Sequence, residues 1–517
     1  MLAPGGTGLP GAELPRSPDE HAGTPGKLAI GGGCRPLGGM ASDDAPLLVW
    51  FRRDLRLGDN RALARAAASG SPVVPVFVWD QAGEGEWAAG RAGRVYLHRA
   101  LQSLRESLRA RGLDLVCRQG PSEEELNRLL VETGARGVYW NRLYEPATIA
   151  RDRRIKEHLR AGGYEAESFN SALLFEPQEI ATQAGHPFQV FTPFWRNASR
   201  RPVDSPEPDP RDGLRPPAGG LPAGPLEDLG LWPDHPWAER VAGYWAIGED
   251  AARAQLSHFV TEGVEAYATA RDLPATAGTS RLSPALHWGT LGPRQIWAAV
   301  ERTGRAEAEG PRTFLAEIGW REFAHHVLFH FPRTPEEPLR EKFADFPWED
   351  DAQARRAWRA GRTGYPIVDA GMRQLYEEGW MHNRVRMIVG SLLVKHLLQP
   401  WQAGARWFWD CLVDADLAAN TLGWQWSGGC GADAAPYFRV FNPMTQGKKF
   451  DPAGAYVRRY VPELGELPDA YVHEPWEAPE TVLGQAGLRL GRDYPRPIID
   501  HREGRQRALA AFAEVKG

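Results

Sequence analysis

The stretch LLVWFRRDLRLGDNRALARAAASGSPVVPVFVW, residues 47–79, decides the fold of the first half of the chain. Its two ends, Leu47–Phe51 and Val73–Trp79, are apolar runs of strand length that are rich in β-branched and aromatic residues. The segment between them, NRALARAAAS at 60–69, has the composition of a helix. A strand, a helix and a second strand in this order predict the start of a parallel sheet.

The same alternation continues beyond that stretch. We expect a helix over 94–111, strands in LDLVCR (113–118) and GVYWN (137–141), and a last extended segment in EAESFNSALLF (165–175). This pattern predicts a Rossmann-like α/β domain over residues 46–175, with a parallel sheet and helices on both of its faces. Neither GxGxxG nor GxxxxGK(S/T) follows a predicted strand, so the usual phosphate-binding loops are absent from the sequence.

The remaining segments differ in composition. Residues 1–45 are rich in Gly and Pro without apolar periodicity, which predicts a disordered extension, and Met40 is a candidate start codon. A second Pro- and Gly-rich stretch at 202–225 lies in a polar connection, 176–242, that predicts a long surface loop. From 243 to 510, segments of helical period follow one another and predict an all-α domain.

Composition excludes several classes of protein. The net charge is −5 at pH 7, so any nucleic-acid partner would have to bind a local basic patch. The cysteines form no CxxC pair and no metal-ligand spacing, which argues against a metal site and suits a reducing cytoplasm. The most apolar window, 385–398, contains Arg386, Lys395 and His396 and predicts a buried helix rather than a membrane span.

Two segments of the helical half can hold a polar ligand. GTSRLSP at 278–284 places three hydroxyl residues before a helical pattern, where they can bind a phosphate, although plain N-capping is the alternative. GWMHNRVRM (379–387) and DADLAAN (414–420) combine Arg, Asp and Asn in an apolar context. Buried charges are costly unless paired, so this set favours a ligand site over interhelical bonds alone.

Two further segments combine aromatic and polar residues. FLAEIGWREFAHH at 314–326 puts Glu317 and Trp320 on one helical face, where they can bond and stack on a base outside its duplex, unless the helix is simply amphipathic. The neighbouring His325–His326 pair is interpreted as structural. In GWQWSGG the indoles of Trp424 and Trp426 point in different directions, one toward the core and one toward a cleft.

Together with FRRDLRLGDN at 51–60, these segments resemble the photolyase and cryptochrome family from about Leu47 to about Leu464. The resemblance implies an α-helical FAD-binding domain. By residue-to-residue correspondence it implies these cofactor-binding residues: Tyr267, Thr279, Ser280, Arg281, Leu282, Ser283, Arg386, Asp414, Asp416 and Asn420. In this set Arg386 pairs with Asp414 near the flavin, Asp416 contacts its ring, and Asn420 faces its N5.

The resemblance also implies a reaction, the light-driven splitting of cyclobutane pyrimidine dimers by a class I photolyase, because WQW is typical of that class. The implied catalytic residues are Glu317 and Asn383 at the dimer and an electron relay of Trp424, Trp401 and Trp348. The implied contacts to damaged DNA are Arg271, Glu317, Trp320, Arg384, Met387, Trp426 and Arg439. We expect a monomer with no membrane partner.

Two questions stay open at this point. The α/β domain of the family holds a second, light-harvesting chromophore, a deazaflavin or a folate (methenyltetrahydrofolate). This sequence has Ala147 and Thr148 where some relatives carry an acidic folate ligand. The rival function is a cryptochrome-like blue-light sensor without repair activity, and the retained lesion-contacting residues favour repair. An unrelated FAD oxidoreductase is disfavoured because the dinucleotide fingerprint is absent.

Overall fold

A computed structural model describes residues 44–210, 213–218, 223–434 and 438–515. The predicted disordered extension therefore lies almost wholly outside the described residues, as does part of the Pro- and Gly-rich stretch.

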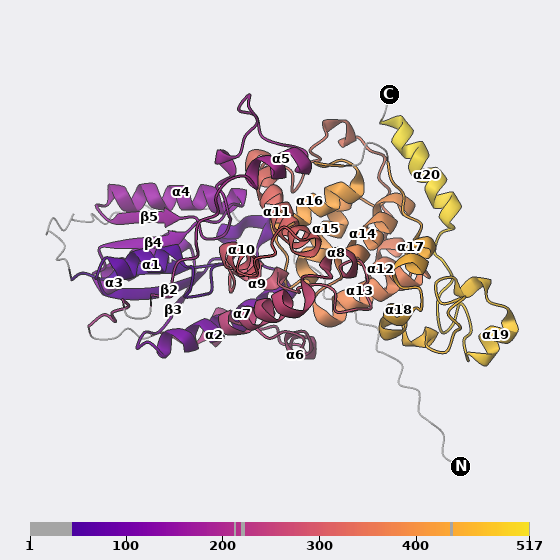
Figure 1. The fold of residues 1–517 in the computed structure, drawn as a ribbon, viewed down its shortest axis with the longest axis horizontal. Coiled ribbons are helices and arrows are strands. Elements are labelled where there is room, and N and C mark those ends of the chain that lie inside the picture. Colours follow the sequence, from indigo (N-terminus) through magenta and orange to yellow (C-terminus); the bar gives the residue numbers. More distant parts are fainter. Residues whose placement is uncertain (1–43, 211–212, 219–222, 435–437, 516–517) are drawn as a thin grey trace, which may run out of the picture. The chain divides into compact units, whose positions relative to one another are not determined.

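The first half of the described chain forms a five-stranded parallel sheet (Figure 1). Its strands are β1 (Leu47–Phe51), β2 (Val73–Trp79), β3 (Val116–Gln119), β4 (Gly137–Asn141) and β5 (Glu165–Phe169). Their order is β3-β2-β1-β4-β5, and Leu47 of the central strand pairs with Val73 on one side and Gly137 on the other. The predicted α/β class is confirmed. The last strand ends at Phe169 rather than near Phe175.

Helices cover both faces of this sheet. They are α1 (Arg61–Ala68), α2 (Arg91–Arg109), α3 (Ser122–Thr133) and α4 (Pro146–Ala161), with a short 3-10 segment η1 (Ala82–Trp87). Alternate residues of β1 explain the arrangement, because successive strand side chains point to opposite faces. Leu47, Val49 and Phe51 pack with α1 and α2, whereas Leu48 and Trp50 pack with α3 and α4.

The connection after β5 is partly helical, which corrects the prediction of a long loop. It contains η2 (Pro177–Glu179), α5 (Phe191–Ala198), η3 (Leu226–Leu229) and α6 (Pro236–Gly243). Phe194 and Ala198 of α5 are buried, so this helix is stabilised by packing against the rest of the protein rather than by its own short sequence.

After α6 the described chain is helical, as predicted. The elements are α7 (Glu249–His258), η4 (Phe259–Gly263), α8 (Tyr267–Ala270), α9 (Ser283–Trp288), α10 (Pro293–Glu301), α11 (Glu309–His330), η5 (Glu341–Phe343), α12 (Ala352–Arg359), α13 (Pro366–Glu378), α14 (Asn383–Ser391), η6 (Leu392–His396), α15 (Trp401–Cys411), α16 (Leu417–Gly428), α17 (Pro443–Phe450), α18 (Ala455–Tyr460), η7 (Pro462–Leu464), η8 (Pro475–Glu477), α19 (Glu480–Gln485) and α20 (His501–Glu514).

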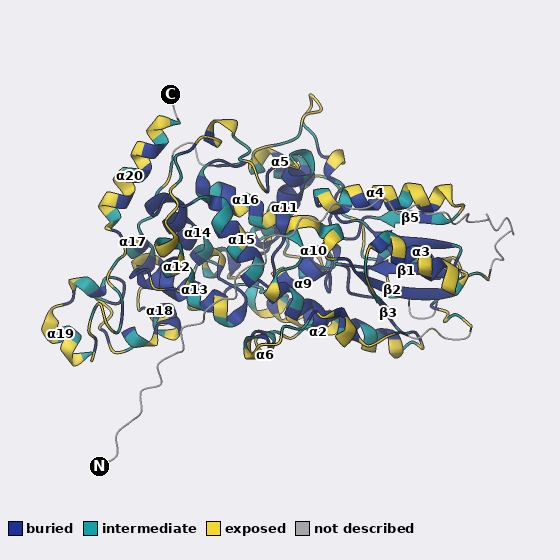
Figure 2. Cartoon of the chain, turned by 180° about the vertical axis from the view of Figure 1, so that it is seen from behind, coloured by how far each residue is buried: buried dark blue, intermediate teal, exposed yellow. Residues whose placement is uncertain are grey.

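The apolar window at 385–398 lies inside the helical half. It forms α14 and the π-helical turn η6, and the side chains of η6 are buried (Figure 2). The prediction of a buried helix is confirmed. Within the described ranges, no helix is long and apolar enough to cross a membrane.

A buried charge network joins the two halves. Asp59, in the loop after β1, is fully buried and accepts two hydrogen bonds from Arg294 of α10, at 3.0 and 2.7 Å. Arg56 donates to the backbone oxygens of Gly289 and Ser171. Buried charges are stable only when paired in this way, so the network fixes the junction between the α/β and helical halves.

Candidate functional site

Asp416, the predicted flavin-ring contact, is held by two histidines. It forms the N-cap of α16, and its Oδ2 lies 3.2 Å from Nε2 of His325 and 3.8 Å from Nδ1 of His287. Burial alone would raise the pKa of Asp416, but the two histidines keep that pKa well below its ordinary range. The carboxylate is therefore charged. His325 thus contacts a predicted cofactor ligand, and its interpretation as structural stays a prediction.

Arg386 and Asp414 pair as the resemblance implies. Nη2 of Arg386 lies 3.0 and 2.9 Å from the two carboxylate oxygens of Asp414. The guanidinium also lies 6.0 Å from the ring of Trp380, whose Nε1 is 3.4 Å from Oγ of Ser283. These contacts connect the start of α9, the start of α14 and the loop before α16.

The side chain of Arg281 has a different environment from the hydroxyl residues around it. Its guanidinium lies between the indoles of Trp245 and Trp380, 4.6 and 4.7 Å from their centres, and bonds to the buried Glu378 at 3.0 Å. Arg281 also has a positive φ of 52°, which is unusual for a residue with a side chain. Its side chain therefore anchors this loop to the buried Glu378.

Asn420 and Trp424 lie one turn apart on α16. Nδ2 of Asn420 donates to the backbone oxygen of Ala405 at 3.1 Å. Trp424 is buried and packs so closely on α15 that a Cβ on Gly404 would approach its ring to 2.1 Å. Glycine is therefore required at 404 for this indole to occupy its place.

The three predicted relay tryptophans share one hydrophobic cluster. Trp401 begins α15 and is buried with Trp424, whereas Trp348 is half-buried at the edge of the cluster, against Phe346. Trp358 contacts Trp424 edge to face at 6.1 Å between ring centres. This close indole neighbour had no predicted role, and no motif in the sequence distinguishes it.

The predicted lesion residue Glu317 is paired in this structure. On α11 it accepts a hydrogen bond from Nη1 of Arg271, whose guanidinium lies 5.4 Å from the ring of Tyr267. Both charged side chains are partly exposed. Three predicted contacts are thus adjacent: Tyr267 to the cofactor, Arg271 to DNA and Glu317 to the lesion.

Arg384 is held by three neighbours. Its Nη2 bonds to Asp272 at 2.7 Å, its Nη1 lies 3.8 Å from Sδ of Met387, and its guanidinium stacks 4.5 Å above the ring of Phe450. Asp272 directly follows Arg271. Sequence reasoning missed Asp272 because an ion pair across 112 residues leaves no local pattern.

Trp320 is the end of a three-ring stack. Phe191 of α5 lies 3.8 Å from it at an interplanar angle of 10°, and Trp195 lies 6.2 Å from Phe191 at 11°. Trp195 rests on Gly319, where a Cβ would come within 2.5 Å of its ring. The backbone N–H of Phe191 donates to Asp433 at 3.2 Å. Stacking on Phe191 therefore fixes the orientation of the Trp320 ring and covers one of its two faces.

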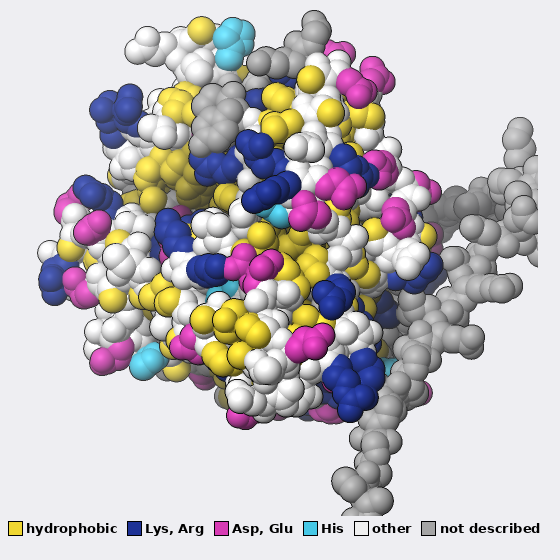
Figure 3. Space-filling view, turned by 90° about the vertical axis from the view of Figure 1, so that its right-hand side faces the viewer, with side chains coloured by type: hydrophobic (Ala, Val, Ile, Leu, Met, Phe, Trp, Pro, Cys, Tyr) yellow, Lys and Arg dark blue, Asp and Glu magenta, His cyan; other side chains and the backbone are white. Residues whose placement is uncertain are grey.

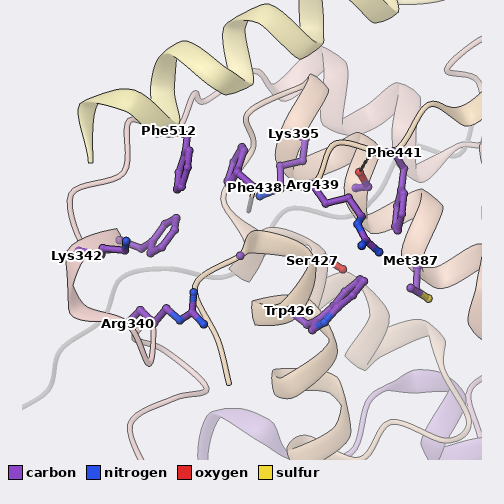
Figure 4. A pocket seen from close by; sticks show the side chains of 13 residues that line it. Arg340, Lys342, Met387, Lys395, Trp426, Ser427, Phe438, Arg439, Phe441 and Phe512 are labelled. Atoms are coloured by element: carbon purple, nitrogen blue, oxygen red, sulfur yellow. Dashed lines mark hydrogen bonds between the residues drawn. The ribbon is translucent and has the colours of Figure 1, made fainter. Parts of the chain in front are cut away.

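Met387, Trp426 and Arg439 line one hollow (Figure 4). Trp426 is half-buried, in contrast to the buried Trp424, so the predicted divergence of the two indoles is confirmed. Asn383 is the first residue of α14, the helix that carries Arg384, Arg386 and Met387. Six of the predicted DNA-contact residues therefore belong to two neighbouring groups, one around Arg271, Glu317 and Arg384 and one around this hollow.

A separate hollow lies between η1, the start of α4 and α15. About 430 Å³ of it is open to the centre of a water molecule. Its lining includes Arg53, Glu84, Glu145, Trp87 and Trp409. Arg53 forms ion pairs with both carboxylates, and the two indoles meet edge to face at 5.3 Å.

The polar groups of the described ranges fit a flavin site better than a metal site. No group of three His, Cys, Asp or Glu suited to a metal ion occurs within those ranges. Beside Asp416, in contrast, Nδ1 of His325 is buried without a hydrogen-bond partner, whereas Nδ1 of His287 faces the Asp416 carboxylate at 3.8 Å. A buried nitrogen without a partner requires a polar ligand or water, so the donor set fits a polar cofactor.

The chain matches two protein families. Residues 47–211 match the family described as DNA photolyase, and residues 314–514 match the FAD-binding domain of DNA photolyase. A deoxyribodipyrimidine photo-lyase of Agrobacterium fabrum is 46% identical over 92% of this chain and 99% of its own length. Cryptochrome-2 of Arabidopsis thaliana is 39% identical over 92% and 79% of the respective chains. The chain therefore belongs to the photolyase and cryptochrome family.

Solved structures agree. A bacterial class III photolyase from Agrobacterium tumefaciens superposes with a TM-score of 0.88 at 45% identity, covering 93% of this chain and all of the other. An archaeal photolyase from Sulfolobus tokodaii, solved with two FAD molecules, superposes with a TM-score of 0.77 at 28% identity, covering 91% of this chain and all of the other. The helical half is thus an FAD-binding domain of the photolyase type.

Proposed function

We propose that this protein is a deoxyribodipyrimidine photo-lyase, which repairs cyclobutane pyrimidine dimers in DNA with blue light. The observation that carries the proposal is the adjacency of the Arg271–Glu317 pair and the Asp272–Arg384 pair. A carboxylate for the bases and two guanidiniums for phosphates lie together beside Tyr267, a predicted cofactor contact. The photo-lyases among the relatives support the same activity.

The residues have separate tasks in this proposal. Arg271, Arg384 and Arg439 bind DNA phosphates, and the dimer leaves the duplex because its damaged bases stack weakly. Trp320 and Trp426 bound the dimer, while Glu317 and Asn383 hydrogen-bond to it. FAD, when bound and reduced, supplies the electron that light transfers to the dimer. Asp416, Arg386, Asp414 and Asn420 hold and orient that cofactor.

A class III enzyme is the subgroup we propose. The WQW pattern predicted class I, but the comparisons give that assignment no support. A solved class III photolyase covers 93% of this chain at 45% identity. Both classes are photolyases, so the proposed roles of Glu317 and Trp320 are the same in either class.

We also propose that the second hollow holds the light-harvesting chromophore. Its lining of two indoles, four carboxylates and two guanidiniums suits a flat, polar heterocycle. Ala147 and Thr148, which replace the acidic folate ligand of some relatives, line this hollow as well. Glu145 or Glu84 can supply a carboxylate in their place. Whether the chromophore is a folate or a deazaflavin is decided by the absorption and mass of the extracted pigment.

The alternative is a cryptochrome-like sensor, because Cryptochrome-2 and Cryptochrome-1 of Arabidopsis thaliana are 39% identical to this chain. Retention of Glu317, Trp320, Asn383, Met387 and Trp426 favours repair. The deciding experiment incubates purified holoprotein with an oligonucleotide containing one thymine dimer, in light and in darkness. Light-dependent recovery of intact thymines is expected. Binding of the dimer without any repair by the reduced holoprotein would favour the sensor.

A further inference from the structure

The hollow that contains Trp426 extends beyond the predicted dimer contacts. Met387, Trp426, Phe441 and Arg439 lie at one end of it, and Arg340, Lys342 and Phe512 lie at the other (Figure 4). The second group comes from η5 and its flank and from α20, elements to which the resemblance assigned no DNA contact. About 70 Å³ of the hollow is open to the centre of a water molecule, which is space for several waters or one phosphate group.

The charged side chains among the described residues that line this hollow are all basic. Four cationic residues line it, Arg340, Lys342, Lys395 and Arg439, and no Asp or Glu is found among its described lining residues. The chain as a whole carries a charge of −5, so such a concentration of positive charge is local. On the face seen in Figure 3, Lys and Arg side chains gather beside exposed hydrophobic side chains, with Asp and Glu side chains next to them.

Lys395 is the most deeply buried of these basic residues, and the protein accepts only part of the hydrogen bonds that its ammonium group can donate. It lies in the π-helical turn η6 with 1% of its surface exposed. Its Nζ donates to the backbone oxygen of Gly428 at 2.7 Å and lies 3.1 Å from the ring centre of Phe438. An ammonium group has three donors, so a hydrogen-bonding anion would stabilise it. Burial lowers the pKa of Lys395 well below its usual value, which is the cost that such an anion would offset.

The mouth of the hollow supplies exposed charge in fixed positions. Lys342 is exposed above the ring of Phe343, 5.6 Å from its centre. Arg340 donates from Nη2 to the backbone oxygen of Ala434 at 3.2 Å, which holds its guanidinium at the rim. Phe512 stacks on Phe438 at 4.4 Å and 8°, which braces this wall with α20.

We propose that this hollow is a second phosphate site for the DNA, taking a backbone phosphate that neighbours the dimer rather than the dimer itself. The inference rests on the proposed function, because DNA is the phosphate source to which it commits. Trp426 lies between the dimer and this phosphate site. Its indole bounds the dimer, and Arg340 and Lys342, at the far end of the hollow, neutralise the phosphate of the neighbouring nucleotide. The site adds affinity for an extended strand and adds nothing for an isolated dimer.

The test uses the holoprotein and its salt dependence. For duplex DNA, every phosphate that the protein ceases to neutralise lowers the slope of log Kd against log salt by about 0.9. We expect the double variant Arg340→Ala, Lys342→Ala to show a decrease of about this size on a dimer-containing duplex. Lys342→Arg keeps the charge and should keep the slope. Arg153→Ala, at an exposed position of α4, is the matched control for the removal of a surface charge.

A short substrate separates this proposal from the proposed function. A dinucleotide that contains only the dimer lacks the neighbouring phosphate, so the double variant should bind and repair it as the wild type does. An unchanged salt slope on the duplex would overturn the phosphate site while leaving the repair function intact. Stabilisation of the wild type by inorganic phosphate, together with an unchanged slope, would identify a free-anion site instead and also overturn the proposal. Failure of the wild type to repair even the dinucleotide would overturn the proposed function itself.

Discussion

Glu317 accepts a hydrogen bond from Arg271, although the two residues are 46 positions apart and both are assigned to the DNA complex. The next residue, Asp272, binds Arg384 in the same manner. Each partly exposed guanidinium thus has a carboxylate partner in the free protein. A DNA phosphate must compete with that carboxylate, which penalises weak, non-specific contacts more than a well-fitted damaged site.

Glu317→Ala should affect the reaction more than it affects binding. A hydrogen bond that strengthens as charge develops on the dimer acts on the transition state, and freeing Arg271 compensates part of the lost affinity. We expect the repair quantum yield per bound complex to fall about fivefold or more, with Kd changed about twofold or less. Fluorescence titration and photolysis on one duplex measure the two quantities. If the affinity for damaged DNA falls and the repair quantum yield per bound complex is unchanged, Glu317 contributes to binding of the dimer and not to the reaction.

Trp320→Ala should weaken binding of damaged DNA by about 1–3 kcal/mol, because one stacking platform is removed. Phe191→Leu should have a smaller effect in the same direction, since it removes the ring behind Trp320 without removing Trp320. Phe188→Leu is the matched control, because Phe188 packs against Phe194 and His326 instead. Equal Kd values for Phe191→Leu and Phe188→Leu would mean that the stack has no role in binding.

Trp424→Phe should block the photoreduction of oxidised flavin while repair by chemically pre-reduced holoprotein continues. Phenylalanine fills most of the space on Gly404 but is much harder to oxidise than indole. Trp232→Phe, in contact with His98 and Arg99, is the control for the removal of a distant indole. Absorption changes under blue light with an external reductant give the rates. Photoreduction of Trp424→Phe at the wild-type rate would exclude this indole as the first relay station.

Asp416→Asn should reduce stability in a pH-dependent manner. His325 and His287 hold the folded-state pKa of Asp416 well below the ordinary value of 3.8. A depressed carboxyl pKa stabilises the fold above the unfolded-state pKa, and this stabilisation is lost as pH falls through the folded-state pKa. At pH 7 the substitution should cost about 1–3 kcal/mol, the usual effect of removing the charged acceptor of buried hydrogen bonds. Urea unfolding from pH 7 to pH 2 tests this, because the stabilisation is lost only below the ordinary carboxyl pKa of 3.8; a difference that does not shrink below that pH would contradict the assignment.

The elements of this fold were predictable where one local pattern determines them. The buried runs at 47–51, 73–79 and 137–141 were predicted with the bounds they have, because a central parallel strand is apolar on both faces. Helix α5 was not, since its eight residues are helical only through the packing of Phe194 and Ala198. Short helices of this type carry no sufficient signal of their own.

The arrangement of the candidate site was likewise predictable only where residues close in sequence determine it. Glu317 with Trp320 and Trp424 with Trp426 are close in sequence, so their arrangement on a helix could be predicted from spacing. Asp272 beside Arg384, Phe191 behind Trp320 and His325 on Asp416 are all contacts between distant segments. Residue type alone does not select these partners from the many Asp, Phe and His residues of the chain. They became visible only when the helices were packed together.

The buried pair between Asp59 and Arg294 has an optical consequence. Transfer of excitation between two pigments depends steeply on their separation and on the relative orientation of their transition dipoles. The proposed light-harvesting hollow is lined by residues of both halves, and this pair joins the two halves, so it favours one separation and one orientation of the two pigments. A variant that loosens this junction should therefore transfer less excitation energy from the second chromophore to the flavin. Repair driven by light that the flavin absorbs directly should be unchanged.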